Sequence, residues 1–485
     1  MILLFKRKNY WGLLPLILSL FIAFLLYHKN FSFDLIGFKN GNNLISMFFT
    51  AITILFSLSL ILFFSHFRKQ TYYKKLLLLG VALFFIVINF RSHLPFQFSV
   101  IFAVIVLIYF LFEKKIYRPN LLFISLFIYF GIDTISLLWT YNPEQGFHYW
   151  GNITPIAFIP ILFCFFKLDK KDFELIVLLI FRFSIIFSFI SICSWIVECR
   201  FLNFPLENSL SIKKYTVDIY NSYDVVYAWS KKVHPTYNAL NFLFSLSVGW
   251  YYIFKKNIDN NVSFSELLFL ILTSLLLSII TASRFLFVGW IVVNILGFLF
   301  VIRRKKTLLA TCASCIIIFV ALFMLFNSGE ITNFVQDPVR KCHYNAAFQG
   351  IKENTWLGTG LGGMTKYINR DNPVYAPLHL SKAELFPHEH PHNEIIGDWM
   401  QTGIPGLVAI LLILSVLFYY GIKQRNWLLL INAIIFFILM TIEMPLMYSN
   451  GIFAFTLIFS LLTHRIDTGS GILFNFNNKK NQIDT

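Results

Sequence analysis

Three histidines stand together in the segment His388-Glu-His-Pro-His-Asn393, directly before a long apolar run. Imidazoles ligate metal ions, and histidines two residues apart on an extended segment can share one. The surrounding sequence offers no second histidine, cysteine or aspartate pair at ligand spacing. The segment taken alone therefore leaves two interpretations open, a metal site and a solvated histidine-rich loop.

Two arginines are the strongest candidate partners for these histidines. Arg284 ends the segment Thr281-Ala-Ser-Arg284, at the predicted outer junction of two apolar runs. An arginine there is costly unless it pairs with an anion, although snorkelling of its head group to the interface is the alternative. Arg340 lies in Pro338-Val-Arg340-Lys341, near the start of a long connection. Together the two planar, permanently charged guanidinium groups indicate a cradle for phosphate.

The glycine segment Gly358-Thr-Gly-Leu-Gly-Gly363 matches the pattern G-x-G-x-x-G, which marks a dinucleotide site in many proteins. Here it follows no convincing strand and opens no βαβ unit, and the predicted topology places it outside the cell's nucleotide pool. We therefore expect a turn in which the missing side chains permit close approach of the backbone.

Two charged residues fall within apolar runs, Asp133 and Arg182. Ionisable side chains in membrane segments mark ion or proton paths or pair with each other to hold helices together. We favour the structural interpretation for both.

Apolar residues dominate the whole chain: 57% of the 485 residues are hydrophobic, only 13% are charged, and the mean hydropathy is +0.69. This composition excludes a water-soluble protein and makes the bilayer its solvent. Apolar runs of roughly 17 to 25 residues can cross a hydrocarbon core about 30 Å thick as helices. The sequence predicts fourteen such helices, near residues 9–27, 44–65, 76–90, 96–112, 120–139, 150–166, 173–196, 237–254, 266–282, 285–302, 307–326, 394–420, 427–443 and 447–463.

The net charge of +16 could indicate a nucleic-acid partner, but the distribution of basic residues argues for membrane orientation instead. Lysine and arginine gather in alternate connections between the predicted helices, whereas the short connections on the other side carry few. Basic residues stay in the cytoplasm, so this asymmetry predicts cytoplasmic N- and C-termini. The clusters include Lys6/Arg7/Lys8, Lys74/Lys75, Lys114/Lys115, Lys170/Lys171, Arg303/Arg304 and Lys479/Lys480.

Two connections, near residues 197–236 and 327–393, are too long to be turns, and the topology places both outside, where function should concentrate. The second contains a helix-like stretch over 344–354 and is expected to fold as a small cap. The polar tail after Gly471 is expected to be disordered. We divide the chain into N-terminal helices with the first outer loop (1–236), central helices (237–326), the cap (327–393), C-terminal helices (394–465) and a cytoplasmic tail (466–485).

These motifs together resemble the O-antigen ligase and polymerase superfamily of lipid-linked glycan transferases. His392-Asn393, nine residues and then Gly403-Ile-Pro-Gly406 reproduce the family's histidine-asparagine and G-x-x-G signature, at the entry to the third helix from the end. The segments ending at Arg284 and following Arg340 are similar to two further elements of the family, and His234-Pro-Thr-Tyr237 looks like a third. The resemblance covers roughly residues 230–460.

The chain departs from the family pattern at two points. Gln401 stands where many members carry glutamate, and Asp398, one helical turn earlier, is a candidate substitute for that acid. The usual helix count is nearer twelve, so the resemblance implies an all-α polytopic membrane protein of about 12–14 transmembrane helices, GT-C-like, with the periplasmic cap between the eleventh and twelfth predicted helices.

The resemblance implies transfer of a glycan from undecaprenyl diphosphate to an acceptor hydroxyl, on the periplasmic face of a bacterial inner membrane. Neither a metal nor another cofactor is expected, and no nucleic acid. His392 would act as general base, Arg284 and Arg340 would bind the diphosphate, and direct displacement would invert the anomeric centre. Substrate contacts are expected from Asn393, His390, His234 and Arg370, with His388 secondary.

The acceptor is left open by the signature. The lipid A core would make the protein an O-antigen ligase, a growing glycan would make it an O-antigen or capsule polymerase, and a protein acceptor would make it an O-oligosaccharyltransferase. A flippase or transporter of the same lipid-linked glycan is an alternative from another class, motivated by Asp133 and Arg182. Transporters usually show internal repeats and midplane sites, whereas the candidate groups here gather at the outer surface.

Overall fold

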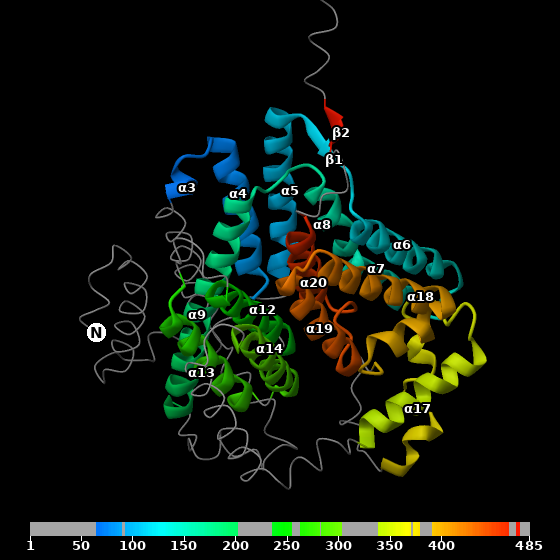
Figure 1. The fold of residues 1–485 in the computed structure, drawn as a ribbon. Coiled ribbons are helices and arrows are strands. Elements are labelled where there is room, and N and C mark those ends of the chain that lie inside the picture. The colour runs from blue at the N-terminus through cyan, green and yellow to red at the C-terminus, as the bar shows by residue number, and fades with distance from the viewer. Residues whose placement is uncertain are drawn as a thin grey trace, which may run out of the picture. The chain divides into compact units, whose positions relative to one another are not determined.

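A computed structural model describes residues 65–89, 93–201, 235–254, 262–281, 283–302, 338–369, 372–378, 390–464 and 472–475 (Figure 1). These residues are mostly helical, as an all-α membrane protein requires. The predicted apolar helices 9–27 and 307–326, and nearly all of 44–65, lie outside the described residues.

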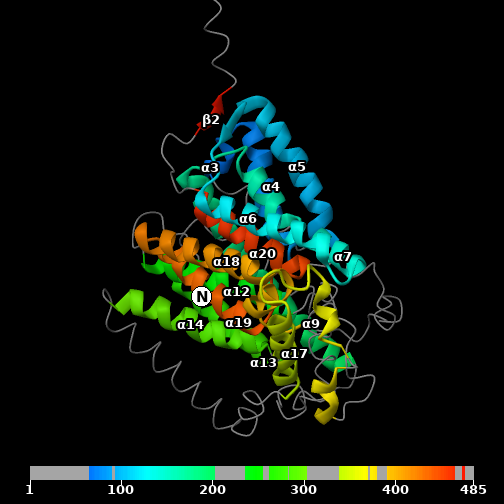
Figure 2. The ribbon, with the colours of Figure 1, turned by 90° about the vertical axis from the view of Figure 1, so that its right-hand side faces the viewer.

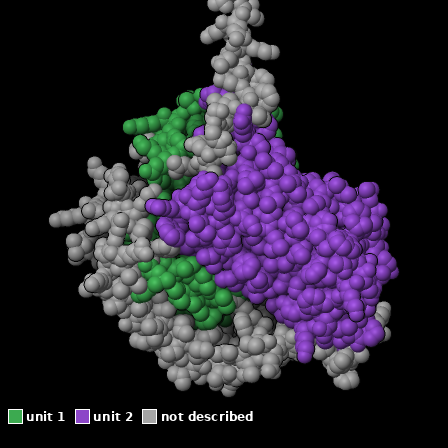
Figure 3. All heavy atoms as spheres, turned by 45° about the vertical axis from the view of Figure 1, so that its right-hand side comes forward, with its two compact units in different colours: residues 1–112, 168–301 green, residues 113–167, 302–485 purple. Residues whose placement is uncertain are grey.

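The chain divides into two compact units, each formed from two stretches of sequence (Figure 3). Unit 1 comprises residues 1–112 and 168–301, and unit 2 comprises residues 113–167 and 302–485.

Unit 1 is a bundle of helices that match seven of the predicted elements or their flanks. They are α3 (Ser65–Arg68), α4 (Tyr72–Val87), α5 (His93–Glu113), α9 (Lys170–Phe201), α12 (Pro235–Phe254), α13 (Phe264–Ile280) and α14 (Arg284–Ile302). Helix α9 packs against α4, α12 and α13. Small hydroxyl side chains join these helices, since Ser184 bonds Ser245 across 2.7 Å and Ser188 bonds Thr273 across 3.0 Å. Such residues let apolar helices approach closely where no water is present.

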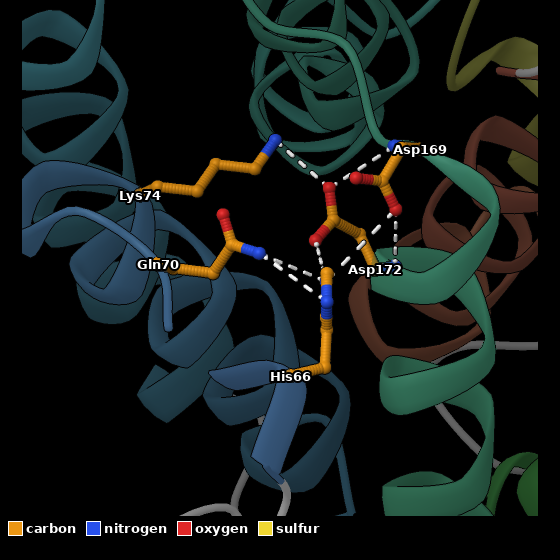
Figure 4. Close-up of polar contacts among 5 residues, drawn as sticks. All are labelled: His66, Gln70, Lys74, Asp169 and Asp172. Atoms are coloured by element: carbon orange, nitrogen blue, oxygen red, sulfur yellow. Dashed lines mark hydrogen bonds and ion pairs between the residues drawn. The ribbon is translucent and has the colours of Figure 1, made fainter. Parts of the chain in front are cut away.

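One end of unit 1 is held by a charged cluster at the start of α9 (Figure 4). Asp172 is fully buried and contacts His66 Nε2 through Oδ1 and Lys74 Nζ through Oδ2, each at 2.9 Å. Asp169 and Asp172 also accept each other's backbone N–H, which caps the first turn of α9. Because the buried carboxylate is paired and hydrogen-bonded, the cluster fixes α3 and α4 to α9.

Unit 2 contains the C-terminal helices, the elements of the long connection that precedes them and two short strands. Its elements are β1 (Lys115–Tyr117), α6 (Leu121–Ser136), η5 (Leu137–Trp139), α7 (Pro143–Ile153), α8 (Pro155–Phe163), α17 (Pro338–Glu353), η8 (Gly363–Lys366), η9 (Pro373–Leu378), α18 (Glu394–Lys423), α19 (Trp427–Ile442), α20 (Ser449–Thr463) and β2 (Ile472–Asn475). Helix α18 packs against α6, α17 and α19 (Figure 2). Helix α20 packs against α8.

Two sequence-based expectations in unit 2 need correction. The run 150–166 is not one helix, because the helix is interrupted at Thr154-Pro155, between α7 and α8. Proline has no N–H to continue the helical hydrogen bonds. The tail after Gly471 is not wholly irregular, because Ile472–Asn475 forms β2. This strand pairs antiparallel with β1, with Lys115 opposite Asn475. Its Ile-Leu-Phe sequence suits a strand better than the polar residues that follow it.

Four helical stretches of the described chain are long and apolar enough to cross a membrane: Leu94–Glu113, Leu121–Trp139, Lys170–Ile192 and Glu394–Lys423. Shorter apolar helices accompany them at Phe264–Ile280, Phe285–Leu299, Trp427–Ile442 and Ser449–Thr463. The described residues are therefore mostly helical and consistent with the all-α membrane protein that the composition predicts.

Candidate active site

His392 lies just before α18, where three elements of unit 2 converge. Its Nδ1 is 3.1 Å from Oε2 of Glu443, the residue that ends α19. A carboxylate only accepts hydrogen bonds, so this contact places the ring proton on Nδ1 and leaves Nε2 as the proton acceptor. His392 has a left-handed backbone with φ of 50°, which is uncommon outside glycine. Such strained positions cluster at functional sites.

Asn393 fixes the backbone on the other side of His392. Its Oδ1 accepts the N–H of Ile396 at 3.0 Å and so caps α18, while its Nδ2 donates to the carbonyl of Thr441 at 3.3 Å. Asparagine is among the best residues for such a cap. The two bonds tie the start of α18 to the end of α19, and this holds His392 beside Glu443.

Arg340, on α17, approaches the opposite oxygen of Glu443. Its Nη2 lies 3.5 Å from Oε1 of Glu443, and its Nη1 donates to the carbonyl of Ile442 at 3.1 Å. Glu443 therefore joins the predicted base His392 to the predicted anion-binding Arg340. The Arg340 side chain remains partly exposed.

Aromatic rings surround His392. The ring of His390 lies 4.1 Å from that of His392, and its Nδ1 accepts the N–H of His392 at 3.2 Å. The ring of Tyr448 stacks edge-on against His390. Burial raises the pKa of Tyr448, and nearby Tyr149 and Glu443 add to the rise, so its hydroxyl stays neutral at physiological pH. His343 lies on the other side of His392, hydrogen-bonded to Tyr375 at 2.8 Å.

The glycine segment docks on a kink in α18. Gly403 is not helical (φ 68°, ψ −155°), and Pro405 has no N–H for the carbonyl of Gln401. The carbonyls of Met400 and Gln401 accept instead from Thr359 N at 2.9 Å and Gly360 N at 2.7 Å. The G-x-x-G segment thus frees two carbonyls of α18 to bond the glycine segment.

The glycines of this segment permit the close approach that their spacing predicts. Gly358, Gly360 and Gly362 all have positive φ. A Cβ at Gly358 would overlap the backbone of Gln401, and one at Gly360 would overlap that of Thr140. The expectation of a turn with close backbone contacts is therefore confirmed.

Gln401, where the chain departs from the family pattern, holds the same segment. Its Oε1 accepts the N–H of Gly362 at 2.9 Å, and the side chain is buried. Its role here is to anchor the glycine segment, and a neutral amide oxygen does this without the cost of burying a carboxylate.

The C-terminal end of helix α17 is hydrogen-bonded to Tyr367. Tyr367 donates its hydroxyl proton to Glu353, and Asn354 Nδ2 donates to Tyr367 Oη at 2.9 Å. Bonds from Tyr367 and Gln349 lower the pKa of Glu353, while burial and the bond to Glu353 raise the pKa of Tyr367. The expected helix-like stretch 344–354 is confirmed, and it begins earlier, at Pro338.

The two charged residues predicted within apolar runs lie in different units. Asp133, 2% exposed on α6, lies close enough to Asp398 on α18 for an electrostatic interaction. Asp398 Oδ1 accepts from Tyr129 Oη at 3.0 Å, so it belongs to a buried polar cluster. Arg182 in unit 1 pairs with Glu266, with Nε 3.5 Å from Oε1.

The structure brings together three of the predicted site residues, His392, His390 and Arg340, and places Asn393 beside them. Arg284 begins α14 in unit 1. His234, His388, Arg370 and the side chain of Arg284 lie outside the described residues.

Glu443 is the candidate site residue that sequence reasoning missed. The sequence carries a signal that could have found it: a single carboxylate at the end of an apolar run, followed by Met-Pro, on the side of the membrane predicted to face outward. A charge at such a junction is costly without a partner. Its partners lie 51 and 103 residues away in sequence, so spacing alone could not identify them.

Comparison with known protein families finds one matching segment, which includes part of this site. Residues 268–411 match the family described as O-antigen ligase (Wzy_C), a range that includes Arg284, Arg340, His390, His392 and Asn393. No curated protein matches the chain. The match covers less than a third of the chain, and over that segment the chain is similar to the O-antigen ligase family, which supports the O-antigen ligase and polymerase superfamily.

Proposed function

We propose that this protein is an O-antigen ligase, which transfers a glycan from undecaprenyl diphosphate to the lipid A core at the periplasmic face of a bacterial inner membrane. The observation that carries the proposal is the contact of Glu443 with both His392 and Arg340. One carboxylate thereby contacts both the proposed base and the proposed anion-binding group. Transfer from a diphosphate uses both groups.

The reaction is a direct displacement at the anomeric carbon. His392 Nε2 removes the proton of the acceptor hydroxyl while that oxygen bonds to the anomeric carbon, and the bond from this carbon to the diphosphate oxygen breaks. Glu443 stabilises the imidazolium that forms, because its carboxylate stays hydrogen-bonded to Nδ1. Polyprenyl diphosphate leaves with the bonding electrons, and the anomeric configuration inverts.

The leaving diphosphate gathers negative charge, which Arg340 is placed to neutralise. Its side chain is partly exposed and shares Glu443 with His392, and a planar fork of donors suits phosphate. We assign Arg284 the same role on the strength of its sequence motif, Thr281-Ala-Ser-Arg284. Substrate contacts are assigned to His390, His234 and Arg370.

Asn393 supports the substrate site by holding the backbone next to His392 in place. Both of its side-chain groups are engaged, one with Ile396 N and one with Thr441 O. It therefore orients His392, and any sugar contact would compete with these two bonds.

The enzyme is proposed to need neither a metal nor another cofactor for transfer. We further propose cytoplasmic termini, 12–14 membrane helices in a GT-C-like arrangement, and a periplasmic cap over residues 327–393. The polyprenyl tail would lie between helices, while the sugars meet the polar cap.

Deleting the gene and examining the lipopolysaccharide on a gel tests the acceptor. Loss of every O-unit from the core is expected for a ligase. A core capped by a single unit would instead identify a polymerase, the second candidate, which the superfamily also contains. An unchanged lipopolysaccharide pattern would contradict both and direct attention to a capsule or protein acceptor. Lipid-linked glycan trapped in the inner leaflet would identify a transporter.

A further inference from the structure

The groups around His392 are also arranged as metal ligands. One ring nitrogen each of His390 and His392 and one carboxylate oxygen of Glu443 all lie within 4.8 Å of one another. The sequence shows only the histidines of this set, because Glu443 is 51 residues from His392. We propose that His390, His392 and Glu443 form a site for a zinc-type divalent ion, and that occupation of this site inhibits the enzyme.

The separation of the ligand atoms fits a transition metal. Zinc binds histidine nitrogen and carboxylate oxygen at about 2.0–2.2 Å, so two such ligands on one tetrahedral ion lie roughly 3.3 Å apart. His392 Nδ1 and Glu443 Oε2 are 3.1 Å apart. The metal would therefore take the place of the proton that these atoms now share, and that proton is released.

Two histidines and one glutamate form a ligand set that zinc commonly uses with its fourth position open. The ring centroids of His390 and His392 are 4.1 Å apart, and each ring offers one nitrogen within 4.8 Å of the other ligand atoms. Hard cations such as Mg²⁺ and Ca²⁺ prefer oxygen ligands, so the site should discriminate against them. Arg340 approaches Oε1 of Glu443 and leaves Oε2 on the side of His392.

A second cluster in unit 1, His66 with Asp169 and Asp172, also has ligand atoms within 4.8 Å of one another. Both oxygens of Asp172 already have partners, as Figure 4 shows. Oδ2 pairs with Lys74 Nζ and accepts the backbone N–H of Asp169, and Oδ1 contacts His66. It serves as the matched control for metal binding.

Inhibition rests on the proposed function, whereas binding does not. A ring whose Nδ1 is bonded to a dication is a poor proton acceptor at Nε2, and Glu443 can no longer stabilise the imidazolium. Zinc should therefore suppress transfer, and a chelator should restore it.

Calorimetric titration of Zn²⁺ into the purified full-length protein, stripped of metal and held in nanodiscs, tests the binding. One zinc per chain is expected, with affinity at least tenfold weaker in Glu443→Gln and His390→Ala. It should be unchanged in His66→Ala and in His148→Ala, which removes an exposed histidine of α7. Arg340→Gln should tighten binding, because a positive charge beside Glu443 is removed. Equal affinity in wild type and Glu443→Gln, or no saturable binding, would overturn the site.

Transfer by wild type, measured with and without saturating Zn²⁺, tests the inhibition separately. At least a tenfold loss that EDTA reverses is expected. Transfer unaffected by saturating zinc would refute the inhibition. Zinc binding by a protein that shows no transfer at all would contradict the proposed function but leave the metal site standing.

Discussion

Replacing Glu443 by glutamine should slow transfer without removing the base. Glutamine has nearly the size of glutamate but only one acceptor oxygen, so it can serve His392 Nδ1 or Arg340 Nη2, and not both. It also removes the negative charge that stabilises the imidazolium. The variant should therefore fold normally while its transition state is less stable.

The size of the effect follows from the hydrogen bond that is weakened. A hydrogen bond to a charged group contributes about 1.5–3 kcal/mol. Since about 1.4 kcal/mol corresponds to a factor of ten in rate, kcat should fall roughly 10- to 150-fold. Removing the base itself with His392→Ala should cost more, about 10²–10⁴-fold.

The assay is transfer of a labelled glycan by purified protein in nanodiscs, with kcat and KM determined separately. Glu353→Gln is the matched control, since this exposed cap glutamate bonds Tyr367 and Gln349. The control should retain wild-type kcat. A Glu443→Gln variant with wild-type kcat would refute the role of Glu443 in supporting the base.

Further predictions concern the elements that hold the site, each checked on detergent-solubilised protein. Gly360→Ala should destabilise the protein by at least about 1–2 kcal/mol in thermal unfolding, from the left-handed backbone alone; a wild-type transition would contradict the close contact with Thr140. Gln401→Ala should cost about 1–3 kcal/mol, because the buried N–H of Gly362 loses its acceptor. Asp172→Asn should cost about 3–5 kcal/mol, since it breaks a buried ion pair with Lys74; an unshifted transition would show that the cluster does not hold α9. The lowered pKa of Glu353 means that its contribution to stability is present above the ordinary carboxyl pKa and is lost as pH falls through the lowered value. The protection of backbone amides over 338–369, measured by hydrogen exchange and corrected for the intrinsic exchange rate at each pH, should therefore fall in acid, and Glu353→Gln should abolish that dependence.

Much of the fold follows from local sequence. Apolar length predicts α9, α18, α19 and α20 to within a few residues, because each helix must bury a continuous apolar surface. Among the described residues, the run 150–166 is an exception. Its apolar length predicts one helix, but the helix is interrupted at Pro155. Composition alone cannot distinguish one long helix from two short ones when both are apolar.

The candidate site was only partly predictable. His392 and Arg340 carry residue types that suggest chemistry, and their motifs drew attention to them. Glu443 directly follows α19, in a segment that matches no motif. Its proposed role becomes visible only when α17, α18 and α19 pack together. The docking of the glycine segment on Gln401 is similarly non-local, since it depends on carbonyls freed by the kink at Gly403.

The central claim, that His392 is the base of a glycan transferase, is tested most directly by single-turnover transfer with purified protein. The reactants are a polyprenyl-diphosphate-linked glycan and a lipid A core acceptor. Wild-type protein should form the glycosylated core and release polyprenyl diphosphate in equal amounts, while His392→Ala should form neither at a rate within a hundredfold of wild type. Near-normal transfer by His392→Ala would contradict the account.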